Sequence, residues 1–147
     1  MNDRHHRPAS RAAIALVAVL ALGACGSSKA ASKKTPAATL EKVATGQIGR
    51  ITLTEQAVKR LDIKTTPVEA GTGATPLKVP FASVIYQPDG TTWVYANLEG
   101  LVFKRESIKI DRIETQAAWL TAGPPAGTKI VTVGASELWG FEFGVGK

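Results

Sequence analysis

The sequence is poor in sulfur and imidazole. Among its 147 residues it has one cysteine, one methionine and two histidines, and all four lie within the first 25 residues. Residues 26–147 therefore offer none of the thiolate, thioether or imidazole groups that bind transition metals. They also lack the side chain that most often carries acid–base catalysis near neutral pH. We expect no metal site, no cofactor and no enzymatic activity.

The sequence also lacks an apolar run long enough to cross a membrane as a helix. Its longest run, Ala12 to Leu22, has 11 residues, whereas a spanning helix needs about 20. Three arginines and one aspartate precede this run, and the small residues Gly23 and Ala24 follow it. A basic start, a short apolar stretch and small residues are typical of a secretory signal peptide. We predict that residues 1–24 form one.

The single cysteine stands directly after this pattern. Leu22-Gly23-Ala24-Cys25 resembles the lipobox of bacterial lipoproteins, in which the cysteine thiol takes diacylglycerol and becomes the first residue after cleavage. The alternative is an ordinary signal peptide with Cys25 as a stray thiol. An unpaired thiol is unusual in a secreted protein, which favours lipidation. We therefore expect Cys25 to anchor the chain in the cell membrane, on its extracytoplasmic face.

Positive charge is concentrated near the N-terminus. The formal net charge of +6 divides into +2 for residues 1–24, +3 for residues 25–47 and +1 for residues 48–147. A nearly neutral C-terminal part argues against nucleic acid as a partner. Lysines beside a lipid anchor could bind an anionic membrane surface, or they could belong to a solvated linker.

Composition divides the exported chain into a linker and a domain. Residues 25–47 are mostly small and polar with scattered lysines, which buries too little apolar surface to offset ordering entropy. We predict a lipidated cysteine and a flexible linker with a reach of roughly 25 Å. Residues 48–147 show short strand patterns separated by turn signals, which favours a small antiparallel β-domain.

The expected fold class is mainly β, a small antiparallel β-roll or barrel-like domain with one short helix. Thr54 to Leu61 has helical spacing, with Thr54 as the N-cap. Pro67 confines the strand over 63–69 to an edge or a bulge. Residues 71–76 are expected to form a flexible joint. The other predicted strands cover residues 48–53, 77–80, 82–86, 91–96, 101–110, 115–121 and 129–133.

Two stretches together resemble the periplasmic adaptor, or membrane fusion, proteins of RND-type tripartite efflux pumps. The first, residues 51–68, is similar to the segment that opens many adaptors. The second is similar in order and spacing to the adaptor membrane-proximal domain, with Gly123 and Gly127 at the glycine spacing of the loop before its last strand. It consists of Val79 to Tyr86, Thr92 to Tyr95, Phe103 to Arg105 and Ala122 to Gly134.

The resemblance implies a β-roll without catalytic residues that rests on an inner-membrane transporter. A full adaptor places a lipoyl domain and usually a helical hairpin between the two stretches, where this chain has only Ala70 to Thr75. The chain is thus similar to the transporter-facing part of an adaptor alone. This resemblance implies that the partner is an integral membrane transporter.

Several residues have two interpretations. Trp93 and Tyr95 share one strand face, and Trp119 lies on another strand. We expect Trp93 and Tyr95 to pack in the core or across strands, rather than to bind a ligand or a protein. We expect Trp119 to lie in the core. The cluster Lys104 to Glu106 is expected to form a solvated face. Asp111 and Glu114 are a carboxylate pair of the kind that glycosidases use, but nothing in the sequence positions them for chemistry.

The aromatic tail supplies the candidate partner contact. Its aromatic residues Trp139, Phe141 and Phe143 alternate with glycines and one glutamate. After one helical turn over 135–138, we expect the glycines to prevent a helix, so that the three rings face one side of an extended tail. That tail either closes the roll as an edge strand or offers a hydrophobic docking strip.

The function we expect is that of a non-catalytic, membrane-anchored lipoprotein that assists or contacts a membrane transporter. One alternative is an envelope lipoprotein that binds a small hydrophobic ligand inside the roll. Another is a structural envelope protein or a decayed adaptor. An apolar cavity would favour the ligand-binding alternative, and a filled core would favour the adaptor-like function.

Overall fold

The computed structural model describes residues 36–41, 43–44 and 47–145. The predicted signal peptide, Cys25 and most of the predicted linker lie outside these residues. The described residues belong to one compact unit. Its strands are β1 (Ala38–Leu40), β2 (Arg50–Leu53), β3 (Lys64–Pro67), β4 (Glu69–Thr72), β5 (Thr75–Pro80), β6 (Ile85–Tyr86), β7 (Thr92–Glu99), β8 (Val102–Glu114), β9 (Ala117–Ala122) and β10 (Lys129–Val133). Its helices are α1 (Glu55–Arg60), the 3-10 helix η1 (Phe81–Ser83) and α2 (Ala135–Phe143).

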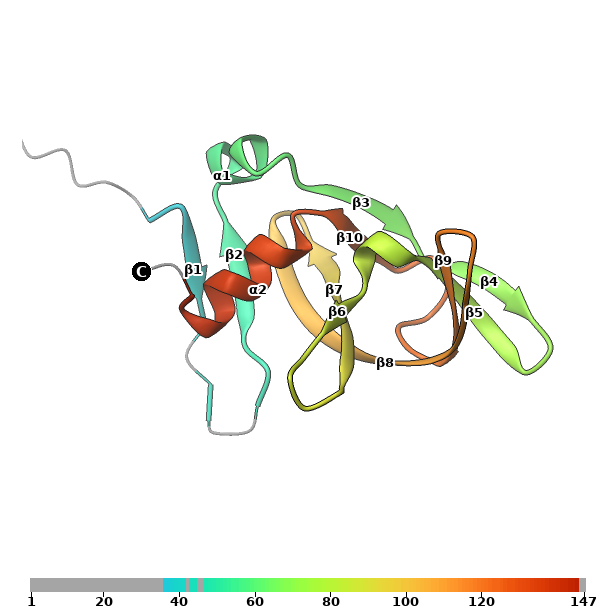
Figure 1. The fold of residues 1–147 in the computed structure, drawn as a ribbon. Coiled ribbons are helices and arrows are strands. Elements are labelled where there is room, and N and C mark those ends of the chain that lie inside the picture. Colours follow the sequence, from blue (N-terminus) through green and yellow to red (C-terminus); the bar gives the residue numbers. More distant parts are fainter. Residues whose placement is uncertain (1–35, 42, 45–46, 146–147) are drawn as a thin grey trace, which may run out of the picture. The chain divides into compact units, whose positions relative to one another are not determined.

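The strands form a nearly closed antiparallel barrel of seven strands, which confirms the predicted fold class (Figure 1). The order around the barrel is β3-β10-β7-β8-β9-β5-β4. The first and last strands of this path, β3 and β4, are consecutive in sequence and separated only by Val68. The Val68 N–H donates to the Thr128 carbonyl, and the Val68 carbonyl accepts from the Gly127 N–H, each over 2.8 Å. One bent segment therefore brings the two ends of the sheet together.

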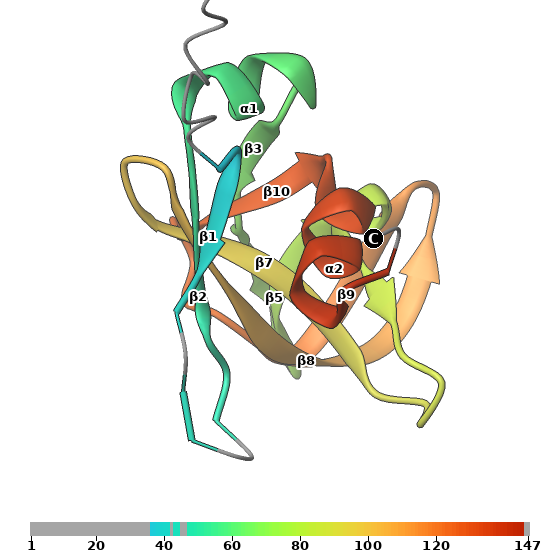
Figure 2. The same cartoon turned by 90° about the vertical axis from the view of Figure 1, so that its left-hand side faces the viewer.

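Alternation along the strands separates two hydrophobic cores. On β7, Val94 and Ala96 are fully buried on one side and Tyr95 is fully buried on the other. The barrel interior is filled by Val68, Val79, Val94, Ile108, Ala118, Leu120 and Ile130. The second core lies outside the barrel, where β2 and the two α-helices pack against β7, β8 and β10. It contains Ile51, Leu53, Ala57, Tyr95, Phe103, Val131, Ala135 and Leu138. Figure 2 shows α1 and α2 beside the barrel strands.

Helix α1 forms where the sequence predicts a helix, and Thr54 is its N-cap as predicted. Thr54 accepts a hydrogen bond from the Ala57 N–H over 3.1 Å, which satisfies one of the free donors at the helix start. Pro67 is on β3, which among the described strands pairs with β10 alone and ends the strand path, so the predicted edge position is confirmed.

Several predicted boundaries differ from the structure. The strand predicted over residues 82–86 is wrong in its first half, because Phe81–Ser83 form η1 and only Ile85 and Tyr86 pair with β7. The sheet reaches back to Ala38, into the stretch assigned to a linker, because β1 pairs with β2. The stretch predicted as a flexible joint is instead the β4–β5 hairpin, in which Gly71 permits a close approach: a Cβ there would lie 2.0 Å from the Thr75 carbonyl oxygen. Thr115 and Gln116 do not begin a strand. Both have positive φ and form the two-residue turn between β8 and β9.

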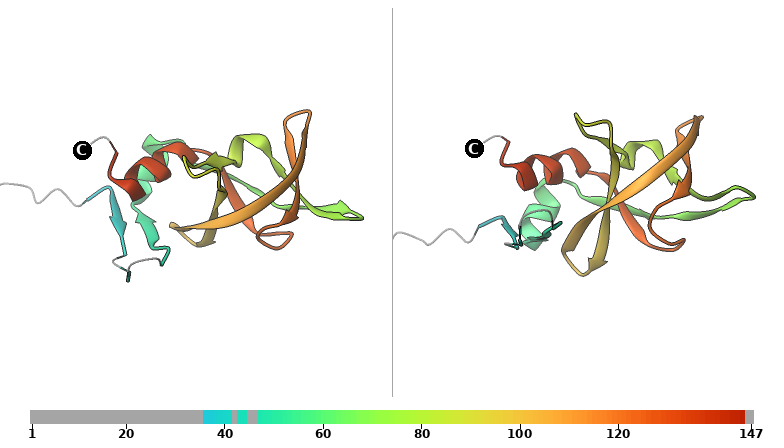
Figure 3. Two further views of the ribbon diagram at one scale, coloured as in Figure 1. Left: turned by 60° about the horizontal axis from the view of Figure 1, so that its bottom comes forward. Right: turned by 90° about the horizontal axis from the view of Figure 1, so that it is seen from below.

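The predicted extended tail is wrong, because residues 135–143 form a helix. A single glycine such as Gly140 costs only about 1 kcal/mol relative to alanine in a helix interior. Gly134 and Gly144 have φ of 89° and 69° and stand at the two ends of α2, where left-handed backbone favours glycine. These two glycines bound the helix rather than prevent it. The long strand β8, orange in Figure 3, curves along the wall of the barrel.

Candidate functional site

Helix α2 covers the outer face of the strands that carry Tyr95 and Val131. Its own buried residues, Ala135 and Leu138, join the second hydrophobic core. This packing explains why a short helix with one internal glycine is stable, since most helical stability in proteins comes from docking of an apolar face.

A polar cluster fixes the last turn of α2. Glu142 accepts a hydrogen bond from the Tyr95 hydroxyl over 2.5 Å and one from Arg105 Nε over 3.2 Å. Tyr95 is fully buried. Burial raises the pKa of the Tyr95 phenol well above its ordinary value, and the Glu142 carboxylate beside it raises that pKa further. The phenol therefore remains a hydrogen-bond donor at all physiological pH values.

Arg105 lies between two aromatic rings. Its guanidinium carbon is 4.1 Å from the centre of the Trp93 ring and 5.1 Å from the centre of the Phe143 ring. Contacts of this kind are attractive because a ring face carries partial negative charge. Trp93 and Tyr95 therefore make the cross-strand and core contacts that the sequence predicts. The predicted solvated face over 104–106 is wrong for Arg105, whose side chain is only 11% exposed.

The helix separates the three aromatic residues predicted as a partner contact. Trp139 and Phe143 are four positions apart, share one helix face and have ring centres 5.1 Å apart. Phe143 is 48% exposed. Phe141 faces another direction and, like part of Trp139, packs against the second core. The extended strip with three parallel rings does not exist.

A shallow groove lies beside Trp139. It has a volume of about 380 Å³, opens to solvent and is lined by Val84, Ile85, Tyr86, Ser136 and Trp139. Tyr86 is 54% exposed, and its ring centre is 6.4 Å from that of Phe81, another exposed aromatic residue. No sequence pattern identifies Phe81 or Tyr86 as contact residues. Tyr86 directly precedes a turn, which is the only signal that could have placed it at the surface.

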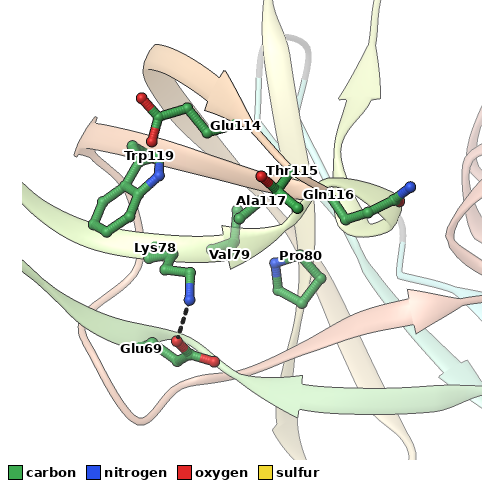
Figure 4. A pocket seen from close by; sticks show the side chains of 9 residues that line it. All are labelled: Glu69, Lys78, Val79, Pro80, Glu114, Thr115, Gln116, Ala117 and Trp119. Carbon is green, nitrogen blue, oxygen red and sulfur yellow. Dashed lines mark hydrogen bonds and ion pairs between the residues drawn. The ribbon is translucent and has the colours of Figure 1, made fainter.

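A second open groove lies on the outside of the barrel wall, around Trp119 (Figure 4). The predicted core position of Trp119 is wrong: its neighbours Ala118 and Leu120 point into the barrel, and Trp119 points outward and is partly exposed. Lys78 and Arg112, opposite Trp119 on the adjacent strands β5 and β8, place their cationic groups 5.7 Å and 4.7 Å from the ring centre. The indole thus contributes to an outer row of cross-strand pairs.

Ion pairs engage the charged groups around this groove. Lys78 Nζ is 2.9 Å from Glu69 Oε2. Asp111 and Glu114 both contact Arg112, at 3.0 Å and 2.9 Å, and these carboxylates, Asp111 foremost, raise the pKa of Arg112. The two carboxylates therefore bind one guanidinium, and nothing in their arrangement places them on either side of a shared substrate position.

Neither a group of metal-ligating side chains nor a relative assigns a function to this surface. In the part of the chain that the structure describes, no three His, Cys, Asp or Glu side chains are grouped so that they could hold a metal ion. Within the same ranges, no helix has the length and apolar character needed to traverse a bilayer. The chain matches no known family profile, no characterised protein and no solved structure.

Proposed function

We propose that this chain is a non-catalytic, lipid-anchored protein of the extracytoplasmic membrane face that acts by contacting a membrane transporter. The resemblance of residues 51–68 and 79–134 to efflux-pump adaptors motivates the choice of partner. The observation that carries the proposal is the filled interior of the barrel.

A barrel that captures a small ligand needs an enclosed apolar cavity. Here seven buried side chains occupy the interior, and four of them are completely inaccessible to solvent: Val94, Ala118, Leu120 and Ile130. The grooves at Trp139 and Trp119 open outward. The filled interior supports action through the outer surface over the ligand-binding alternative.

The working surface in this proposal is the face formed by Tyr86, Trp139 and Phe143. Large aromatic side chains that are exposed in the free protein are common anchors of protein interfaces. Phe141 is not part of this surface, because it packs against the second core. Phe143 also stacks over Arg105, which holds its ring in place without burying it.

In this proposal the short connection between Cys25 and β1 would keep the surface near the membrane. If Cys25 carries the lipid, only the residues between Cys25 and Ala38 connect the anchor to the sheet. Thirteen peptide steps span at most about 45 Å, whatever their conformation. The surface thus stays within reach of a transporter's extracytoplasmic parts.

The test is photo-crosslinking in membranes with a reactive group at position 143, followed by identification of the captured protein. We expect an integral membrane transporter as the main product. Tyr86→Ala should reduce capture with little loss of stability. Ile113→Ala is the matched control, since Ile113 is 47% exposed but lies on the β8 segment near the Thr115 turn. Equal capture by the two variants, or capture of soluble proteins alone, would overturn the proposal.

A further inference from the structure

The indole N–H groups of the three tryptophans differ in their surroundings. Trp93 Nε1 donates to Thr91 Oγ1 over 2.7 Å. Trp119 Nε1 has no hydrogen-bond partner among the described residues, but it stays accessible to water on the barrel wall. Trp139 Nε1 is buried and has no partner within the described part of the chain. Of the three donors, the one on α2 alone is both shielded from water and unpaired.

A second buried donor lies next to the groove at Trp139. Gln87 Nε2 is also buried without a partner, and within residues 36–41, 43–44 and 47–145 these two are the only buried side-chain nitrogens or oxygens in that condition. Gln87 directly follows Tyr86, which lines the groove. Its backbone N–H donates to the Thr91 carbonyl over 2.9 Å, which extends the β6–β7 pairing by one residue. Gln87 therefore lies on the same face of the sheet as the groove residue Ile85, two positions before it.

Both unpaired atoms need the same kind of partner. A buried donor without an acceptor has given up its hydrogen bonds to water and gained none in return. Most buried polar groups in folded proteins do have a partner. Because an indole N–H can only donate and the Gln87 nitrogen is likewise a donor, their complement is an oxygen acceptor rather than an N–H group or a cation.

The groove beside these donors supplies apolar walls. It has a volume of about 380 Å³, opens to solvent and is lined by Val84, Ile85, Tyr86, Ser136 and Trp139. The ring centre of Phe81 lies 6.4 Å from that of Tyr86 and extends the aromatic surface. A ligand that fits this site combines an apolar side chain with a carbonyl oxygen beside it. An extended peptide offers that combination at successive residues, and many proteins recognise it in this way.

We propose that the groove binds an extended peptide segment of the partner protein. A branched aliphatic side chain of the segment lies between Tyr86 and Trp139, and its backbone carbonyl oxygens accept from Trp139 Nε1 and Gln87 Nε2. The inference rests on the proposed function, because the same face is its contact surface, and it names the chemistry of the partner there. Tyr86 is 54% exposed, so its ring can turn aside at little cost in packing and admit the segment.

The experiment follows the three indole N–H signals of the isotope-labelled full chain in dodecyl maltoside micelles by nuclear magnetic resonance. The probe is N-acetylleucine methylamide, which carries one leucine side chain between two peptide groups. We expect the Trp139 signal to shift in a saturable way as the probe is added, while the signals of Trp93 and Trp119 stay in place. Isopentylammonium, which has a similar branched carbon chain but no acceptor, should leave the Trp139 signal unchanged.

Variants of similar shape assign the two donors. Trp139→Phe and Gln87→Met each remove one donor and keep an apolar side chain. Each should weaken probe binding by about five-fold, the equivalent of one hydrogen bond, as read from the backbone amide signal of Ile85. Trp119→Phe is the matched control, since it removes an indole from the other groove and should leave the affinity unchanged. A thermal melt of each variant checks the fold, and Gln87→Met should not lower the melting temperature.

An unchanged Trp139 signal, or equal shifts of all three indole signals, would overturn the proposal. Unchanged affinity in both Trp139→Phe and Gln87→Met would do the same, because apolar contact alone would then hold the probe. A long-lived water contact at the Trp139 N–H before the probe is added would show a donor that is already satisfied, which also refutes the proposal.

The probe experiment and the capture experiment at position 143 fail separately. A transporter captured there without any binding of the probe would leave the proposed function standing and remove the peptide groove. Binding of the probe without a captured transporter would remove the proposed function and leave the peptide groove.

Discussion

Arg105 Nε lies 3.2 Å from Glu142 Oε1, and the two side chains are only 11% and 10% exposed. This ion pair joins β8 to the last turn of α2, and Tyr95 from β7 donates to the other oxygen of the same carboxylate. The end of the helix is therefore held by charge and hydrogen bonds, whereas its beginning is held by apolar packing of Ala135 and Leu138.

Removing one partner of this pair should be costly. Glu142→Ala leaves the Arg105 guanidinium without its carboxylate in a mostly buried position, and we expect a loss of about 3–5 kcal/mol in the free energy of unfolding. Glu114→Ala breaks an ion pair whose carboxylate side chain is 56% exposed, and should cost less than about 1 kcal/mol. Chemical denaturation of the two variants measures both values. Similar values for the two would show that α2 does not depend on the pair.

Tyr95 should make the domain sensitive to alkaline pH. Its pKa is raised above the ordinary value of 10.0 in the folded state, so the unfolded chain loses the phenolic proton first. The stabilisation is fully present below pH 10 and is lost as the pH rises from there towards the folded pKa, by up to about 1.4 kcal/mol per pH unit. Tyr95→Phe should remove this slope, and Tyr86→Phe should retain it. Parallel slopes in the two variants would contradict the assignment.

Gly134 should be the glycine least tolerant of substitution at the helix ends. It has φ of 89°, and a Cβ there would lie 2.1 Å from Ile63 Cδ1. Gly134→Ala therefore combines backbone strain with a clash, and we expect a loss of about 2–4 kcal/mol. Gly90 has φ of 81° with nothing within 4 Å of the added carbon, so Gly90→Ala should cost only the strain, about 1–2 kcal/mol. Equal thermal shifts would indicate that Ile63 moves away freely.

The turn between β8 and β9 should be open to stabilisation. Thr115 and Gln116 have φ of 51° and 74°, and Thr115 is β-branched, which disfavours this conformation. Replacing the pair by Asn-Gly supplies the residues that such two-residue turns prefer. We expect the free energy of unfolding to rise by about 1 kcal/mol. An unchanged or lower melting temperature would show that the native side chains make compensating contacts in the adjacent groove.

The sequence predicts the parts of the fold that depend on local patterns. Thr54 identifies the start of α1 because its side chain caps the helix through a contact with Ala57, only three residues away in the sequence. The strand Lys129–Val133 is predicted with the bounds that the structure has, since glycines delimit it on both sides.

The parts that depend on distant contacts are not predicted. Helix α2 forms because Leu138 and Glu142 find partners on β7 and β8, which no local pattern around Gly140 indicates. β1 is ordered by pairing with β2, although its composition alone suggests a linker. Trp119 faces outward because Lys78 and Arg112 cover its ring, and their positions are fixed only by strand register.

The lipid anchor is the claim on which the location and the partner both depend. Metabolic labelling with a fatty acid analogue, in cells that express the full chain or its Cys25→Ser variant, tests it most directly. We expect the full chain to carry label and to fractionate with membranes, and the variant to carry none and to remain uncleaved or be released. Label that persists in the Cys25→Ser variant, or an unlabelled and secreted full chain, would contradict the account.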